Sequence, residues 1–134
     1  MALSVKTYLG QLLGFIGAVS GITDKVLTRY YYGRLPQNSL YPALSFNIIS
    51  LVTLDTKDGV SEYDYLRVQF TSYAARAADA EDLYDAIRTG FDRFTDEAGT
   101  VKFHETFFKG RQPLEQDFDT KIYYIHTDYE FHIK

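Results

Sequence analysis

Four side chains near the end of the chain carry groups that could bind a metal ion or transfer protons: His126, Asp128, Glu130 and His132. They occupy every second position, so in an extended strand all four point to one face while apolar residues point to the other. Neighbours on that face lie roughly 6.5–7 Å apart, which would let two of them chelate a metal ion together with a ligand from an adjacent strand. The same alternation is typical of a terminal strand with one polar face, and that interpretation needs no metal.

Other combinations of reactive residues give little support to catalysis. The chain has no cysteine, which excludes a disulfide framework, a thiolate zinc site and a cysteine nucleophile. His104 and Glu105 are adjacent, so on a strand they point to opposite faces and cannot share a substrate. The sequence contains no G-x-S-x-G elbow, no phosphate-binding loop and no dinucleotide fingerprint. We therefore expect a structural or interaction protein without catalytic residues, metal or cofactor.

Length and composition describe the kind of molecule that must position these residues. The chain has 134 residues, of which 46% are hydrophobic, and its 12 tyrosines and 10 phenylalanines exclude intrinsic disorder. This length suits one hydrophobic core, so residues 1–134 are expected to form a single domain. A net charge of −4 argues against a protein that holds nucleic acid through its phosphates.

The N-terminal region has two possible interpretations. Residues 7–23 carry no charge and follow a lysine, which imitates a signal peptide. Gln11 and four glycines make the segment only weakly hydrophobic, and it is shorter than the ~20 apolar residues of a membrane span. We favour an amphipathic helix that begins near Ser4 and ends near Gly21, and no membrane association. Its apolar stripe recurs at three- and four-residue steps: Val5, Tyr8, Leu9, Leu12, Ile16 and Val19.

The rest of the chain predicts five strands and one further helix. The helix covers 76–94, where Ala80, Leu83, Ile87, Phe91 and Phe94 form one stripe. The predicted strands are 26–32, 43–55, 63–73, 101–109 and 121–133. The order is α-β-β-β-α-β-β, and most strands are joined by hairpins. The predicted fold class is therefore α+β, an antiparallel sheet with two helices packed on one face.

The hairpin between the second and third strands allows a prediction of register. A three-residue turn at Lys57-Asp58-Gly59 places Phe46 opposite Phe70 and Ile48 opposite Val68. A two-residue Asp-Gly turn would instead pair Ile48 with Gln69. The first register puts apolar pairs together, and we expect Leu83 and Ile87 of the long helix to cover them.

The other face of this hairpin is unexpectedly apolar. It carries Ile49, Leu51, Tyr63 and Tyr65, although a sheet with one solvated side should be polar there. An exposed patch of this kind usually marks an association surface. We therefore predict that these four residues contact a partner, with Lys57 and Asp58 at the tip of the same arm. Alternatively, another strand or the loop 110–119 covers them.

Three segments together resemble the tail-completion proteins of long-tailed bacteriophages, also described as tail-terminator or minor tail proteins. Residues 35–46 contain a leucine-proline-glutamine sequence, a short gap, a second proline and an apolar strand. Residues 67–75 are similar to the family's strand and alanine-rich junction, which the helix 77–94 follows. The aromatic strand 123–133 resembles the family's closing strand.

This resemblance implies a structural protein of the virion, assembled in the host cytoplasm, at the head-proximal end of the tail. Such a protein forms a ring, typically of six copies, which ends polymerisation of the tail tube and joins it to the head-tail connector. The implied partners are further copies of the chain, the major tail tube protein and the connector or stopper protein. Double-stranded DNA would pass through the lumen without specific binding, and neither a cofactor nor a catalytic residue is implied.

Two alternatives remain open from the sequence. One is a different role in the same particle, as a head-side connector or stopper. The other is a small metal- or ligand-binding protein that uses the strand face from His126 to His132.

Overall fold

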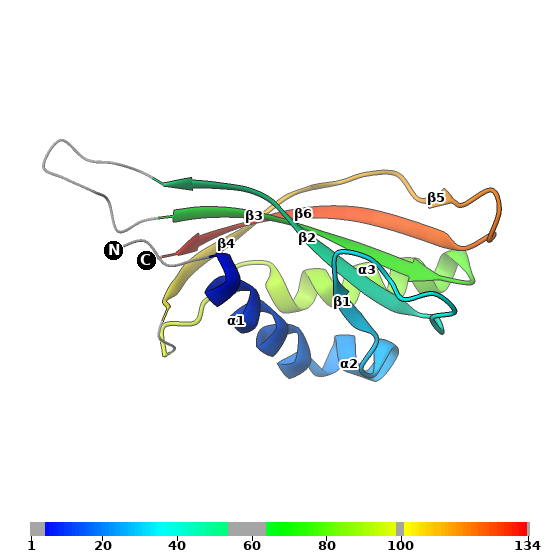
Figure 1. The fold of residues 1–134 in the computed structure, drawn as a ribbon, viewed down its shortest axis with the longest axis horizontal. Helices are drawn as coiled ribbons and strands as arrows, with labels where there is room; N and C mark the ends of the chain where they lie inside the picture. Colours follow the sequence, from blue (N-terminus) through cyan, green and yellow to red (C-terminus); the bar gives the residue numbers. More distant parts are fainter. Residues whose placement is uncertain (1–4, 54–63, 99–100, 134) are drawn as a thin grey trace, which may run out of the picture.

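The computed structural model describes residues 5–53, 64–98 and 101–133, and in these residues three helices cover one face of a six-stranded sheet (Figure 1). The helices are α1 (Val5–Ala18), α2 (Ser20–Val26) and α3 (Ala77–Phe91). The strands are β1 (Tyr30–Tyr32), β2 (Ala43–Thr53), β3 (Asp64–Ala74), β4 (Phe103–Arg111), β5 (Glu115–Gln116) and β6 (Tyr123–Ile133).

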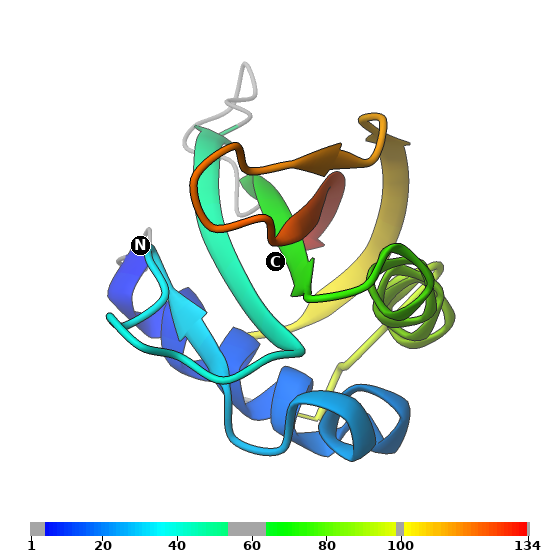
Figure 2. The same ribbon diagram turned by 90° about the vertical axis from the view of Figure 1, so that its right-hand side faces the viewer.

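The sheet order is β1-β2-β3-β6-β4, with the short β5 also paired to β6. The expected α+β architecture, with helices on one face of a largely antiparallel sheet, is confirmed. Two details differ from the prediction. The β1–β2 pair is parallel, and the polar stretch 110–119 contains β5. Figure 2 shows the twisted sheet from the end that carries β5, with the helices along its lower side.

The N-terminal helix that we expected to be continuous is divided into two. Val19 has an extended backbone (φ −86°, ψ 104°), and a second helix follows from Ser20. The break brings Val19 against α3, where a Cβ added at Gly90 would lie 2.8 Å from a Val19 methyl carbon. Gly21 therefore lies inside α2, and the positive φ after the helix belongs to Leu27. The predicted cap Ser4 lies outside the described residues.

The expected strand 26–32 is reduced to Tyr30–Tyr32 because Val26 ends α2 and is fully buried. Strand propensity at Val26 is overridden by the packing of the helix against the sheet. The three tyrosines then pair in parallel with Leu44, Ser45 and Phe46. This short pairing covers only the first part of the outer edge of β2.

The core lies between the helices and the sheet. Leu83 and Ile87 of α3 are fully buried, as are Phe46, Val68 and Phe70 beneath the helices, which confirms the predicted contact. Phe70 stacks on Phe91 of α3 with ring centroids 5.1 Å apart. The N-terminal stripe is also confirmed where it is most buried, at Tyr8, Leu12 and Ile16.

The register of β2 and β3 changes part of the way along the hairpin. Phe46 pairs with Phe70 and Ile48 with Val68, as predicted. A bulge at Ile49 then shifts the pairing, so that Leu51 lies opposite Leu66. One extra residue in a strand moves every later side chain to the other face. Beyond the bulge the register is the one that we had rejected, while the turn Lys57-Asp58-Gly59 itself lies outside the described residues.

Candidate interaction surfaces

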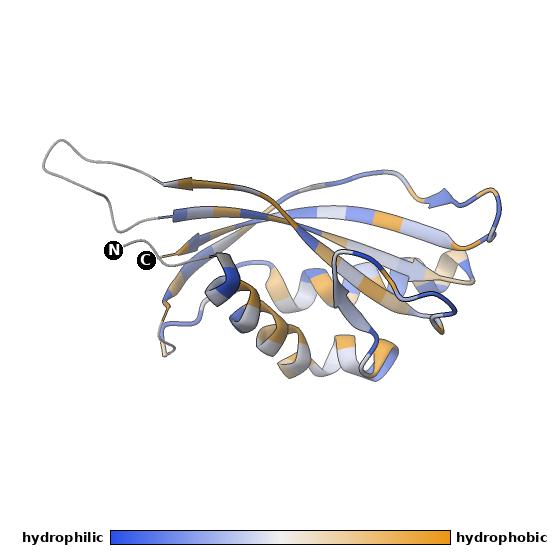
Figure 3. Ribbon diagram, viewed as in Figure 1, coloured by the Kyte–Doolittle hydropathy of each residue, from blue (hydrophilic) through white to orange (hydrophobic). Residues whose placement is uncertain are grey.

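The outer half of β2, residues Ile49–Thr53, is exposed along its whole length and is called distal β2 below. Its apolar side chains are unusually open, with exposed fractions of 51% for Ile49, 36% for Leu51 and 52% for Val52. Figure 3 shows this hydrophobic stretch at the end of the sheet opposite β5. Because β1 pairs only as far as Phe46, no strand among the described residues pairs with the outer edge of distal β2. An unpaired, apolar edge is a template for association with another chain.

The predicted patch is partly rearranged by the bulge. Leu51 pairs with the buried Leu66, so it belongs to the helix side of the sheet and not to the face of Tyr65. Val52 takes the expected place of Leu51, opposite Tyr65. Our assignment of Ile49, Leu51 and Tyr65 to one face was therefore wrong, because it assumed unbroken alternation. Three other candidates, Tyr63, Lys57 and Asp58, lie outside the described residues.

A polar contact links the end of this exposed segment to the first helix. The hydroxyl of Tyr8 in α1 donates a hydrogen bond to the carboxylate of Asp64, which is only 5% exposed. Thr53 donates a second hydrogen bond to the same carboxylate, 2.7 Å away. Thr53 and Asp64 also pair across β2 and β3. The end of β2 and the start of β3 are thus both linked to α1 through Asp64.

The sheet face away from the helices, called the open face, carries the side chains of His126, Asp128, Glu130 and His132 from β6. Each of them has a partner within the sheet. Nδ1 of His126 lies 2.8 Å from Thr71 Oγ1, and Asp128 accepts hydrogen bonds from Arg67 at 2.9 Å and Gln69 at 3.2 Å.

The remaining two members bond to each other, with 2.8 Å between His132 Nε2 and Glu130 Oε1. Lys109 lies 3.9 Å from the same carboxylate oxygen. Among the residues that the structure describes, no group of three or more His, Asp or Glu side chains is placed to hold a metal ion. The alternation thus produces a polar sheet face in which acids pair with bases.

Aromatic rings reinforce both ends of the open face. Tyr65 stacks on His132 with ring centroids 4.1 Å apart. The ring of Phe107 also contacts His132, with 4.8 Å between the two centroids. At the other end, the ring centroid of Tyr124 lies 5.3 Å from that of His126 and 6.3 Å from that of Tyr73. These ring contacts give the face a fixed surface of neutral aromatic and paired charged groups.

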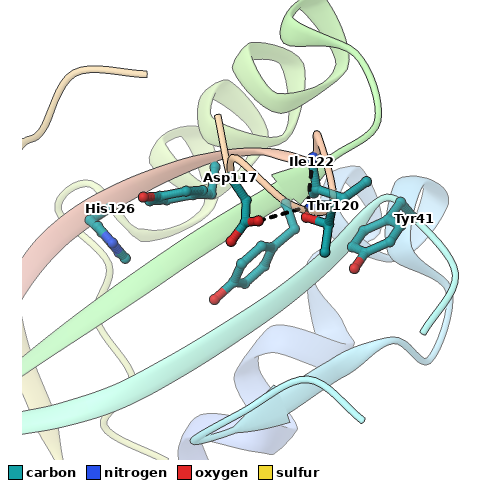
Figure 4. Close-up of a pocket in the computed structure, with 7 residues that line it drawn as sticks. Tyr41, Asp117, Thr120, Ile122 and His126 are labelled. Carbon is teal, nitrogen blue, oxygen red and sulfur yellow. Dashed lines mark hydrogen bonds between the residues drawn. The ribbon is translucent and has the colours of Figure 1, made fainter. Parts of the chain in front are cut away.

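A pocket of about 400 Å³ opens at the β5 end of the open face (Figure 4), and distal β2 lies at the other end of the sheet (Figure 1). Tyr41, Asp117 and His126 line it from three separate segments, and in Figure 4 they are spread along it, with His126 at the left, Asp117 in the middle and Tyr41 at the right. Sequence reasoning missed this site because 110–119 looked like an ordinary polar loop. The one local signal is Asp117 followed by Thr120, a pattern typical of a turn closed by a side-chain carboxylate.

Within the described ranges, no helix is both long enough and apolar enough to cross a membrane. No family model matches the sequence. No curated protein matches it either.

Among solved structures, the fold is similar to that of a chain in the virion of a native gene transfer agent particle. The similarity covers 97% of this chain and 94% of that chain, with a TM-score of 0.68 and 11% sequence identity. The two chains therefore share a fold along almost their whole lengths, and a sequence identity of 11% shows nothing beyond that fold.

Proposed function

We propose that the chain is a structural protein of a phage-like virion that forms a ring at the head-proximal end of the tail tube. In this role it ends tube polymerisation and joins the tube to the head-tail connector. The observation that carries the proposal is the whole-length likeness in fold to a chain of a gene transfer agent virion. The sequence resemblance to tail-completion proteins supports the same role independently of the fold.

Distal β2 supplies the surface that such an assembly needs. Ile49, Leu51 and Val52 expose apolar side chains beside a strand edge with which none of the described strands pairs. A monomer that stays in solution normally shields an edge of this kind with charge, proline or a covering segment. A neighbouring copy in the ring, or the tail tube below it, would remove both the apolar side chains and the free backbone groups from water.

The open face suits the lumen of such a ring. Its cations Arg67 and Lys109 lie next to the carboxylates of Asp128 and Glu130, at 2.9 and 3.9 Å. Because each cation is neutralised by a carboxylate and the chain carries a net charge of −4, the open face attracts passing phosphates only weakly. DNA could therefore move through without being held.

The test combines assembly with a charge placed on distal β2. We expect the purified chain to assemble into rings, detected by light scattering, and to cap tubes of the major tail protein of the same particle. The double variant Leu51→Asp, Val52→Asp should lose both properties and keep a native far-UV circular dichroism spectrum.

Leu27→Asp is the matched control, because Leu27 is also exposed but lies at the end of α2. It should assemble as the unmodified chain does. If the double variant still forms rings and caps tubes, distal β2 is not the interface. If the unmodified chain does neither, the proposed role is wrong.

A further inference from the structure

The pocket at the β5 end of the open face has the composition of a cation-binding site. Its walls include three tyrosine rings, from Tyr41, Tyr73 and Tyr124. Asp117 and Thr120 of the β5–β6 turn complete one side of it. The faces of aromatic rings attract cations, most strongly where several rings surround the same space.

The carboxylate of Asp117 is held in place by its own turn. Oδ1 accepts hydrogen bonds from the backbone N–H groups of Asp119 and Thr120, both at 2.9 Å. The hydrogen bond from Thr120, followed by the one from Asp119, holds the pKa of Asp117 below its usual range. The group is therefore a fixed negative charge at neutral pH. The Thr120 hydroxyl and the charge of Lys121 lower the same pKa further, and among the described residues no ion pair within 4.0 Å involves Asp117.

The same turn displays a large apolar side chain. The side chain of Phe118 is 85% exposed. Two backbone hydrogen bonds close the turn that carries it, from the N–H of Asp117 to the carbonyl of Ile122 and from the N–H of Lys121 to the carbonyl of Asp117. The ammonium group of Lys121 already lies over the Phe118 ring, 4.7 Å from its centroid. A rigid turn that presents a phenylalanine beside a pocket is suited to a polypeptide partner, because the ring can pack on residues that flank the one in the pocket.

We propose that this pocket receives an arginine side chain of a partner protein, with the guanidinium group between the tyrosine rings and the carboxylate of Asp117. A guanidinium group can stack on a ring and bond to a carboxylate at the same time, which a compact metal ion does not do. A metal ion is also disfavoured by the number of ligands, because no group of three or more His, Asp or Glu side chains among the described residues is placed to hold one. The proposal is independent of the virion role, since it concerns one copy of the chain and the opposite end of the sheet.

The experiment is a titration of the isotope-labelled full-length chain, followed by amide chemical shifts in NMR spectra. One probe is a capped Gly-Arg-Gly peptide, and the other is the same peptide with citrulline, a neutral isostere of arginine. We expect the arginine peptide to shift the amides of Thr120, Ile122 and Tyr124, and the citrulline peptide to bind at least five times more weakly.

Two variants of the same turn separate the pocket from general acidity. Asp117→Asn keeps an oxygen that can accept the two backbone hydrogen bonds but removes the charge, so it should weaken binding at least fivefold. Asp119→Asn removes an equal charge from a residue that does not line the pocket, and its affinity should stay within twofold of the unmodified chain. The proposal is overturned if both peptides bind equally, if neither shifts these amides at tens of millimolar, or if the two variants weaken binding alike.

Discussion

The two halves of β2 have similar sequences and very different surroundings. Ala43–Phe46 are buried, whereas every residue from Ile49 to Thr53 is exposed. Both halves pair with β3 in the same antiparallel ladder. The first half also has β1 on its outer edge and helices against one face. Distal β2 has no strand on its outer edge among the described residues, and its side chains remain exposed.

This contrast separates strand formation from burial. Pairing with β3 satisfies the backbone on one edge of β2, and it does so equally for buried and exposed residues. Burial depends on which other elements reach the strand. The apolar residues of distal β2 therefore satisfy the requirements of a strand without contributing to the core, which is the pattern expected of a surface kept for a partner.

The largest effect is expected from truncation in the buried half. Phe46→Ala should lower the free energy of unfolding by about 3–5 kcal/mol, because the removed ring leaves a cavity against Phe70. Urea unfolding measures this loss. The corresponding change in the exposed half, Ile49→Ala, should stay within about 0.5 kcal/mol of the unmodified chain. Equal losses at the two positions would show that distal β2 is covered in solution.

A smaller effect is expected where distal β2 is anchored. Tyr8→Phe removes the hydroxyl that donates to Asp64 and leaves a buried carboxylate with one partner fewer. The expected loss is about 1–3 kcal/mol of unfolding free energy. Thermal or urea unfolding provides the measurement, and a variant as stable as the unmodified chain would mean that α1 does not hold this end of the hairpin.

The same anchor predicts a dependence on alkaline pH. Burial, followed by the hydrogen bond to Asp64, raises the pKa of Tyr8 above its ordinary value of 10.0. The protonated phenol is thus favoured in the folded state, so its contribution is complete below pH 10 and is lost as the pH rises through the folded pKa. Above pH 10, the unfolding free energy should therefore fall less steeply with pH in Tyr8→Phe than in the unmodified chain. The two slopes should differ by at most about 1.4 kcal/mol per pH unit. Identical slopes would contradict this prediction.

The smallest effect on stability is expected for charges in distal β2. Leu51→Asp with Val52→Asp should change the unfolding free energy by less than about 1 kcal/mol, because both positions are open to water. Leu66 pairs directly with Leu51 but is fully buried, so Leu66→Asp should prevent folding. Circular dichroism of the two proteins provides the comparison. Unfolding of the double variant would show that distal β2 is part of the core.

Much of the core could be predicted from local patterns. The stripe of α3 and the pairs Phe46–Phe70 and Ile48–Val68 follow from periods that a helix and a strand impose on any sequence. The polar side of β6 followed from the same alternation. Its interpretation as a paired surface needed the neighbouring strand, because Arg67 and Gln69 are far from Asp128 in the sequence.

The bulge could not be predicted from the pattern that revealed the hairpin. Ile48 and Ile49 are adjacent and alike, so nothing in the sequence marks one of them as the extra residue. The predicted register was chosen from pairs before this point, and it holds only for them. The choice of Ile49 as the extra residue moved Leu51 and Val52 between faces. The Asp117 pocket was hidden for a related reason, since Tyr41 and Tyr73 reach it from segments that share no local pattern with the turn.

The sequence by itself determined the fold class, the principal core and the presence of more apolar surface than one core can hold, because hydrophobic periodicity and composition are properties of the chain alone. Tertiary structure decided which of those apolar residues remain exposed, where the N-terminal helix breaks and which side chains meet in a pocket. Those outcomes depend on contacts between distant segments, such as Val19 with Gly90 and Tyr8 with Asp64. Their energies exist only once the segments are packed together, and no local pattern encodes them.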